Sequence, residues 1–128
     1  MRLLLDTHLI LWSISQSERL SRQARDLLGD PDNELVASVV SLWEIAIKRS
    51  SRRADFTAEP TSIRHQLLAH GYEELPITGE HAVAVTALPP IHGDPFDRML
   101  VAQAIVEGVT LLTADPLVAR YPGPVRKV

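Results

Sequence analysis

The chain has 128 residues, 45% of them hydrophobic, and no cysteine. This length and composition predict one globular domain over residues 1–128 and exclude a disulfide framework or a thiolate metal site. No apolar run is long enough to span a membrane, and the lack of cysteine fits a reducing compartment, so we expect a cytoplasmic protein without membrane attachment. The net charge of −3 disfavours a purely electrostatic nucleic-acid binder.

The first half of the chain alternates short apolar runs with helical patterns. Strands are expected at residues 2–5 and 34–40, and helices at 8–14, at 21–28 and from Ser41 onward. Ser41 and Glu44 match the S-x-x-E capping box, which would place them at a helix start. Lys48 follows Glu44 by four residues, so an ion pair along the helix is a second structural explanation for this acid.

The second half continues the alternation after an expected exposed loop at residues 54–60. Helices are expected at 61–70, 80–88 and from Asp94 to Gly108, and strands at 73–77, at 109–113 and within 121–128. Asp94 and Pro95 suit the cap and first position of the long helix. Strands that alternate with helices predict an α/β fold with a parallel sheet covered on both faces.

Four acids stand where apolar segments end. Asp6 follows the first strand, Glu44 and Asp97 lie at the openings of helices, and Asp115 follows the strand at 109–113. Each has a structural alternative as a helix cap or first-turn acid. Capping does not require the four to converge, whereas the carboxyl ends of parallel strands share one edge, where ligands bind in such folds.

Converging carboxylates repel one another, and a cation would keep them ionised. Oxygen ligands without any thiolate favour Mg²⁺ or Mn²⁺. Such ions support in-line displacement at phosphorus. If Asp94 joins the four acids at this site, the rest of the chain carries a net charge of +2, which suits a substrate made of phosphates.

Four basic residues lie close together at Lys48, Arg49, Arg52 and Arg53. They fit a solvated helix end or a contact with phosphate, and the sequence leaves both open. His8 and His92 lie near the proposed site, where a phosphate contact is conceivable. No phosphate-binding glycine loop or serine-hydrolase motif is present.

Four segments together resemble the PIN-domain ribonucleases, and more narrowly the VapC-type toxins of bacterial toxin–antitoxin pairs. They are Leu-Leu-Leu-Asp6-Thr7-His8, Ser41-Leu-Trp-Glu44-Ile, His92-Gly-Asp94-Pro-Phe-Asp97-Arg98 and Leu-Leu-Thr113-Ala-Asp115. Each segment is weak alone, but the four occur in the family's order and spacing over essentially the whole chain.

The resemblance implies a three-layer α/β/α sandwich with a central parallel sheet and an endoribonuclease that depends on Mg²⁺ or Mn²⁺. It implies Asp6, Glu44, Asp97 and Asp115 as catalytic acids, with Asp6 and Asp97 as the principal metal ligands. We assign accessory roles to Asp94, Thr7, Ser41 and Thr113, and RNA contacts to Arg49, Arg52 and Arg98. The resemblance also implies a homodimer and a cognate VapB-like antitoxin.

Two other functions stay open. A phosphohydrolase with Asp6 as nucleophile would form an aspartyl phosphate, although such enzymes place a second acid where this chain has His8. A non-catalytic PIN-like module would bind RNA or protein without cleavage, although such a module has no use for a set of mutually repelling acids.

Overall fold

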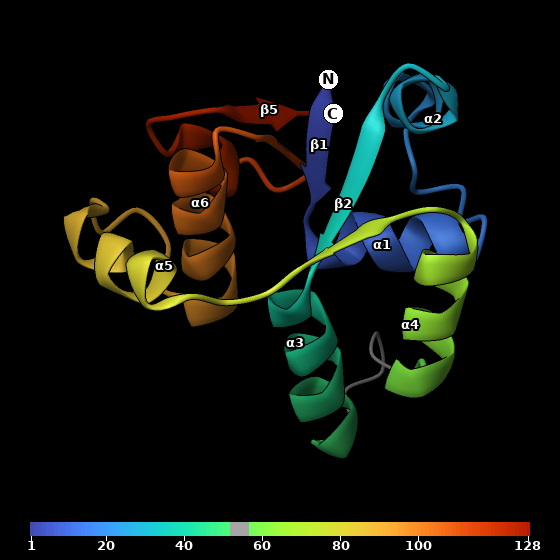
Figure 1. Cartoon of the computed structure of the whole chain (residues 1–128), viewed down its shortest axis with the longest axis horizontal. Helices are drawn as coiled ribbons and strands as arrows, with labels where there is room; N and C mark the ends of the chain where they lie inside the picture. The colour runs from blue at the N-terminus through green and yellow to red at the C-terminus, as the bar shows by residue number, and fades with distance from the viewer. Residues whose placement is uncertain (52–56) are drawn as a thin grey trace.

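The computed structural model describes residues 1–51 and 57–128, and its centre is a sheet of five strands (Figure 1). The strands are β1 (Arg2–Leu5), β2 (Glu34–Ser38), β3 (Glu73–Leu75), β4 (Thr110–Thr113) and β5 (Val125–Lys127). They lie in the order β3-β2-β1-β4-β5, and every neighbouring pair is parallel. The predicted α/β fold with a parallel sheet is confirmed.

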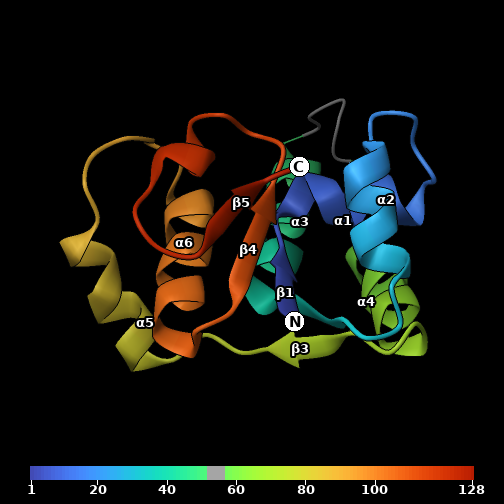
Figure 2. The ribbon, with the colours of Figure 1, turned by 90° about the horizontal axis from the view of Figure 1, so that it is seen from above.

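Helices cover the sheet on both sides. They are α1 (Thr7–Ile14), α2 (Arg22–Gly29), α3 (Val39–Ser50), α4 (Pro60–Ala69), α5 (Gly79–Ala84) and α6 (Pro95–Glu107), with 3₁₀ turns η1 (Val85–Ala87) and η2 (Val118–Arg120). Figure 2 shows α1, α2 and α4 on one side of the sheet and α5 and α6 on the other, which is the expected three-layer sandwich. Within the described ranges, no helix has the length and apolarity needed to cross a membrane.

Strand β1 shows why helices pack against both faces of the sheet. Leu3 and Leu5 point into a core shared with α1, α3 and α4, whereas Leu4 points into a second core shared with α6. All three leucines are fully buried. Because successive side chains of a strand point to opposite faces, a continuous apolar run requires helices on both sides. Each buried leucine contributes about 1.5–3 kcal/mol to this packing.

The junction of β2 and α3 corrects one expectation. The strand ends at Ser38, whose hydroxyl accepts a hydrogen bond from the Val40 N–H at 3.0 Å, so Ser38 is the helix cap. The prediction of a capping box at Ser41 and Glu44 is therefore wrong, because both residues lie inside the helix and are buried. Burial of Val40 in the core offsets the low helix propensity of a β-branched residue at this start.

The long helix α6 begins and ends as its sequence indicates. One carboxylate oxygen of Asp94 accepts hydrogen bonds from the N–H groups of Phe96 and Asp97, at 2.8 and 3.1 Å. Pro95 occupies the first helical position. Gly108 ends the helix in the left-handed conformation, with φ of 66°, where glycine avoids the strain of a side chain.

Three other elements are shorter than the sequence predicts or are divided. The edge strand expected at 73–77 is β3, which ends at Leu75 before Pro76. The helix expected at 80–88 is α5 followed by the 3₁₀ turn η1. After Asp115 the chain forms the short turn η2 before β5 and no α-helix, although the Asp115 carboxylate does accept the Leu117 N–H at 2.8 Å.

Candidate active site

The candidate site lies at the carboxyl edge of the sheet, where β1, β2 and β4 end. Asp6 directly follows β1, and Asp115 follows β4 by two residues. Glu44 reaches the same place from α3, and Asp97 from the first turn of α6. The carboxyl group of Asp97 interacts electrostatically with those of Asp94, Glu44, Asp6 and Asp115. The structure therefore brings the five predicted acids into one region.

Asp6 is held firmly at the start of α1. One of its oxygens accepts the Leu9 N–H at 2.9 Å, and the other accepts the Thr113 hydroxyl at 2.6 Å. Only 5% of the residue is exposed, and this burial raises the pKa of Asp6 although both hydrogen bonds favour the charged form. Asp6 thus caps α1 and also belongs to the acidic cluster, so the two interpretations of this residue are compatible.

Glu44 is buried on α3 and already has its partners within the chain. It accepts a hydrogen bond from the Thr7 hydroxyl, which lies 3.0 Å from the Ser41 hydroxyl oxygen. The Lys48 ammonium pairs with Glu44 and lies 3.5 Å from Asp94. Burial lowers the pKa of Lys48, but the hydrogen bond and negative charge of Glu44 outweigh that effect and raise it. The accessory residues Thr7 and Ser41 therefore lie beside the acid that they were expected to support.

The carboxyl group of Asp97 is affected by the negative charges of the other four acids of the cluster. Burial, followed by the charges of Asp94, Glu44, Asp6 and Asp115, raises the pKa of Asp97 to about 8. One Asp97 oxygen lies 3.5 Å from Nε2 of His92, and the same nitrogen lies 3.3 Å from an oxygen of Asp115. His92, Asp97 and Asp115 offer ligand atoms within 4.8 Å of one another.

The three arginines assigned to RNA have different environments. Arg49 is exposed near the end of α3. Arg98 points inward: its guanidinium donates to the carbonyl of Pro89 at 3.0 Å and to the Tyr121 hydroxyl at 3.1 Å. Arg52 lies outside the described residues. The contacts of Arg98 indicate that it holds the loop before α6.

The sequence profile of the PIN domain matches residues 3–124. The chain belongs to the PIN-domain family. Ribonuclease VapC22 of Mycobacterium tuberculosis is 34% identical over 125 residues, which cover 95% of each chain. This relative extends the likeness to VapC proteins over nearly the whole of this PIN domain.

Solved structures share the fold. VapBC2 of Rickettsia felis, bound to a promoter DNA fragment, aligns with a TM-score of 0.73 and 17% identity over 100% of this chain and 99% of the other. VapBC-5 of Mycobacterium tuberculosis aligns with a TM-score of 0.59 and 21% identity over 99% and 97%. At these identities the alignments support the PIN-like architecture alone.

Two residues of this PIN domain contact the acids in ways that the sequence does not predict. The sequence predicts Lys48 as an ion-pair partner of Glu44, at a solvated helix end or in contact with phosphate. In the structure only 14% of its side chain is exposed, and it reaches Asp94 as well as Glu44. Its i, i+4 spacing was the available signal. His92 was considered for phosphate contact, and the structure directs it toward Asp97 and Asp115. Its position two residues before Asp94 gave no indication of that direction.

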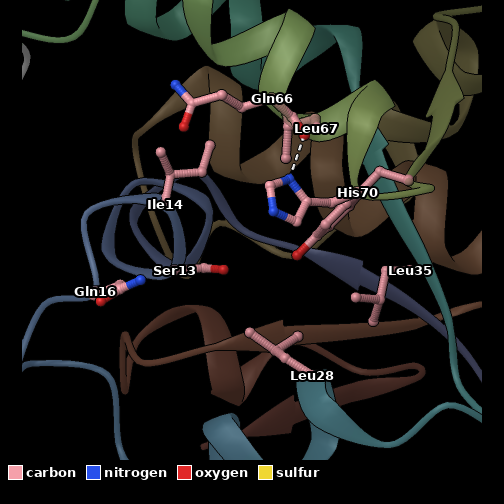
Figure 3. A pocket seen from close by; sticks show the side chains of 9 residues that line it. Ser13, Ile14, Gln16, Leu28, Leu35, Gln66, Leu67 and His70 are labelled. Carbon is pink, nitrogen blue, oxygen red and sulfur yellow. Dashed lines mark hydrogen bonds between the residues drawn. The ribbon is translucent and has the colours of Figure 1, made fainter.

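A cavity of about 360 Å³ lies at the opposite, amino-terminal edge of the sheet. Figure 3 shows it between the end of α1 at Ser13 and Ile14, the end of α2 at Leu28, and the end of α4 at Gln66 and its C-cap His70. The imidazole Nδ1 of His70 lies 2.7 Å from the Gln66 carbonyl oxygen. None of the predicted acids lines this cavity, so it is separate from the candidate site.

Proposed function

We propose that this PIN domain is a metal-dependent endoribonuclease that hydrolyses phosphodiester bonds of RNA as the toxin of a VapBC-type pair. The observation that carries the proposal is the convergence of Asp6, Glu44, Asp97 and Asp115 at the carboxyl edge of the sheet. The relative named as a ribonuclease supports the reaction class. The family match over residues 3–124 supports treating residues 1–128 as a single PIN domain.

The donor set fits a divalent cation. Asp6, Glu44, Asp97 and Asp115 supply carboxylate oxygens. Burial and mutual repulsion raise the pKa of Asp97 to about 8, so negative charge is in excess although Lys48 pairs with Glu44 and lies near Asp94. Oxygen ligands of this kind suit Mg²⁺ or Mn²⁺. We assign Asp6 and Asp97 as the principal ligands, with Glu44 and Asp115 completing the site. When bound, such an ion supplies Lewis-acid stabilisation of the charge that develops on phosphate oxygens.

The chain's own residues orient the acids for this chemistry. The Thr113 hydroxyl and the Leu9 N–H hold the two oxygens of Asp6 in fixed directions. Thr7 does the same for one oxygen of Glu44, and Lys48 offsets its charge. Groups that are oriented before the substrate arrives need little reorganisation during the reaction. Thr7, Ser41 and Thr113 therefore act through the acids, as positioning residues.

Asp94 has two structural tasks that support an accessory role. It caps α6, which fixes the first turn that carries Asp97, and its other oxygen lies 3.5 Å from the Lys48 ammonium. For RNA binding we retain the exposed Arg49 as a phosphate contact. We leave Arg98 out, because its guanidinium is bound to the loop and to Tyr121.

The partners follow from the same family assignment. We propose a VapB-like antitoxin that blocks the site, because the aligned structures are described as VapBC complexes. We also propose a homodimer and a cytoplasmic location. Size-exclusion chromatography with light scattering would test the dimer, and copurification with the product of a small adjacent gene would test the antitoxin.

The test of the function is RNA cleavage by the purified chain with Mg²⁺, with Mn²⁺ and with chelator. We expect cleavage with either ion and none with chelator. Asp6→Asn should reduce the rate by more than the roughly 100-fold that loss of a supporting residue costs. Asp26→Asn on α2 is the matched control, since Asp26 is exposed and lies outside the site. Circular dichroism would show that both variants fold.

Each other function predicts a different result. Equal cleavage by wild type and Asp6→Asn would mean that another site or a contaminating nuclease cleaves the RNA. A trapped phosphoryl group on Asp6 would favour a phosphohydrolase. Absence of both Mn²⁺ binding and cleavage would favour a non-catalytic binding module.

A further inference from the structure

His92 lies in the loop between η1 and α6, beside the acids of the candidate site. Its Nε2 is 3.3 Å from an oxygen of Asp115 and 3.5 Å from an oxygen of Asp97. The imidazole is 21% exposed, so it is partly shielded from water. On distance alone, Nε2 has two possible roles: it is a nitrogen ligand for a cation shared with the two acids, or a hydrogen-bond donor to them.

The other ring nitrogen distinguishes the two roles. Nδ1 of His92 accepts a hydrogen bond from the backbone N–H of Asp94 at 3.0 Å. A backbone amide is always the donor in such a bond, so Nδ1 carries no proton and the proton of the neutral ring lies on Nε2. A protonated nitrogen has no lone pair for a metal. Histidines that bind metals have the reverse arrangement, in which the second nitrogen donates to a carboxylate or carbonyl.

The backbone of His92 is fixed independently of its ring. The His92 N–H donates to the Tyr121 hydroxyl at 2.8 Å, and that hydroxyl donates back to the His92 carbonyl at 3.2 Å. Arg98 also donates to the Tyr121 hydroxyl, at 3.1 Å. Tyr121 is 4% exposed. These contacts fix the backbone of His92, and the hydrogen bond from the Asp94 N–H to Nδ1 then sets the orientation of the ring.

We propose that His92 is a positioning residue that donates a hydrogen bond from Nε2 to the carboxylate of Asp115, with an oxygen of Asp97 3.5 Å from the same nitrogen, and that it is not a metal ligand. The donor lies between two groups that repel each other and holds them near one position. The proposal rests on the proposed function, because those acids are the ones assigned to the ion. Loss of a group that orients ligands typically lowers metal affinity by about 10–100-fold.

The first test locates the ring proton by NMR on protein labelled with ¹⁵N-histidine, before and after addition of Mg²⁺. We expect the long-range ¹H–¹⁵N correlations of His92 to report a protonated Nε2 in both states. A proton that moves to Nδ1 when Mg²⁺ is added would overturn the proposal. So would nitrogen hyperfine coupling from His92 in the spin-echo spectrum of bound Mn²⁺, since such coupling requires direct ligation.

The second test compares two variants in Mn²⁺ binding, measured by electron paramagnetic resonance. The amide nitrogen of His92→Gln stands near the place of Nε2, whereas that of His92→Asn reaches only the place of Nδ1. We expect Gln to keep affinity within a few-fold of wild type and Asn to lose about 10–100-fold. His65→Asn, at an exposed position on α4, is the control.

These outcomes separate the positioning role from the proposed function. If His92→Asn binds Mn²⁺ as tightly as wild type, the positioning role is wrong while the nuclease proposal stands. If wild type neither binds Mn²⁺ nor cleaves RNA, the nuclease proposal fails and the positioning role fails with it. The NMR result on metal-free protein then still decides which ring nitrogen carries the proton.

Discussion

Two polar clusters adjoin helix α6, and they are built on opposite principles. The first is the acidic site at its amino-terminal end. The second, which we call the α6 network, consists of Ser38, His81, Gln103 and Glu107. The Ser38 hydroxyl donates to the Gln103 side-chain carbonyl at 2.6 Å, and the Gln103 amide lies 3.3 Å from the Pro76 carbonyl. Nε2 of His81 lies 2.8 Å from Glu107.

The α6 network pairs donors with acceptors, whereas the acidic site gathers like charges. Nδ1 of His81 accepts the Thr78 N–H at 3.1 Å, which leaves the proton of the neutral ring on Nε2 facing Glu107. In the acidic site, by contrast, burial and four neighbouring carboxylates raise the pKa of Asp97. A satisfied network stabilises the fold, and a repelling one stabilises it only when a cation binds. This difference supports the proposal that the acidic site, and not the α6 network, binds a cation.

The largest expected effect is the pH dependence of stability contributed by Asp97. Its pKa in the folded chain is about 8, above that of an unfolded chain, so its protonated form is favoured by folding. Its contribution is therefore full below about pH 4 and is lost as the pH rises through about 8. We expect metal-free Asp97→Asn to be more stable than wild type by about 2–4 kcal/mol near pH 8 and nearly equal near pH 4.

Urea unfolding of both chains across this pH range, in chelator, measures the difference. Asp26→Asn should follow wild type at every pH, because its carboxyl is exposed on α2. An Asp97→Asn chain that is less stable than wild type at high pH would show that the acidic site contributes favourably without an ion.

The second prediction concerns the α6 network. Gln103 is fully buried, and its amide joins Ser38, Pro76 and His81. Gln103→Ala removes the acceptor of the Ser38 hydroxyl and the donor to the Pro76 carbonyl, and it creates a cavity, so we expect a loss of about 2–4 kcal/mol at every pH. Thermal and urea unfolding would measure it. A change below about 0.5 kcal/mol would mean that water replaces the amide fully.

The elements that were predictable from sequence are those with local chemical signals. Asp94, Pro95 and Gly108 mark both ends of α6, and the structure has each in the expected role. The apolar run at residues 2–5 is β1, without a shift. The approach of Asp6 to Glu44 and Asp97 was also predictable, because parallel strands carry their carboxyl ends to one edge.

What was not predictable depends on side-chain direction in three dimensions. Ser38 caps α3 in place of Ser41, because residues 39 and 40 enter the helix to bury Val40. His92 turns toward Asp115 because a backbone N–H and Tyr121 hold it, and Tyr121 lies 29 positions away in sequence. Arg98 turns away from solvent to bind the Pro89 carbonyl. Spacing rules contain no information on such long-range contacts.

A third prediction uses Mn²⁺ to distinguish the acidic site from the α6 network. Mn²⁺ at 100 times its Kd should stabilise wild type by about 2.7 kcal/mol. Gln103→Ala should gain the same amount, because its defect lies outside the acidic site. Asp97→Asn should gain much less, because it lacks a principal ligand. Differential scanning fluorimetry with and without Mn²⁺ measures all three, and equal gains in all three chains would place the ion elsewhere.

The smallest expected effect comes from Lys48, the ammonium that the acidic site already contains. Lys48→Met keeps the apolar stem and removes the charge beside Glu44 and Asp94. Metal-free protein should lose about 1–2 kcal/mol, because Glu44 keeps the Thr7 hydroxyl as a partner. Lys48→Met should also bind Mn²⁺ more tightly than wild type, since an added cation then offsets more negative charge.

Calorimetric titration with Mn²⁺ tests this prediction, with Arg49→Met on the same helix as the control. Weaker Mn²⁺ binding by Lys48→Met would mean that Lys48 raises the Mn²⁺ affinity by orienting the acids more than it lowers that affinity by its positive charge.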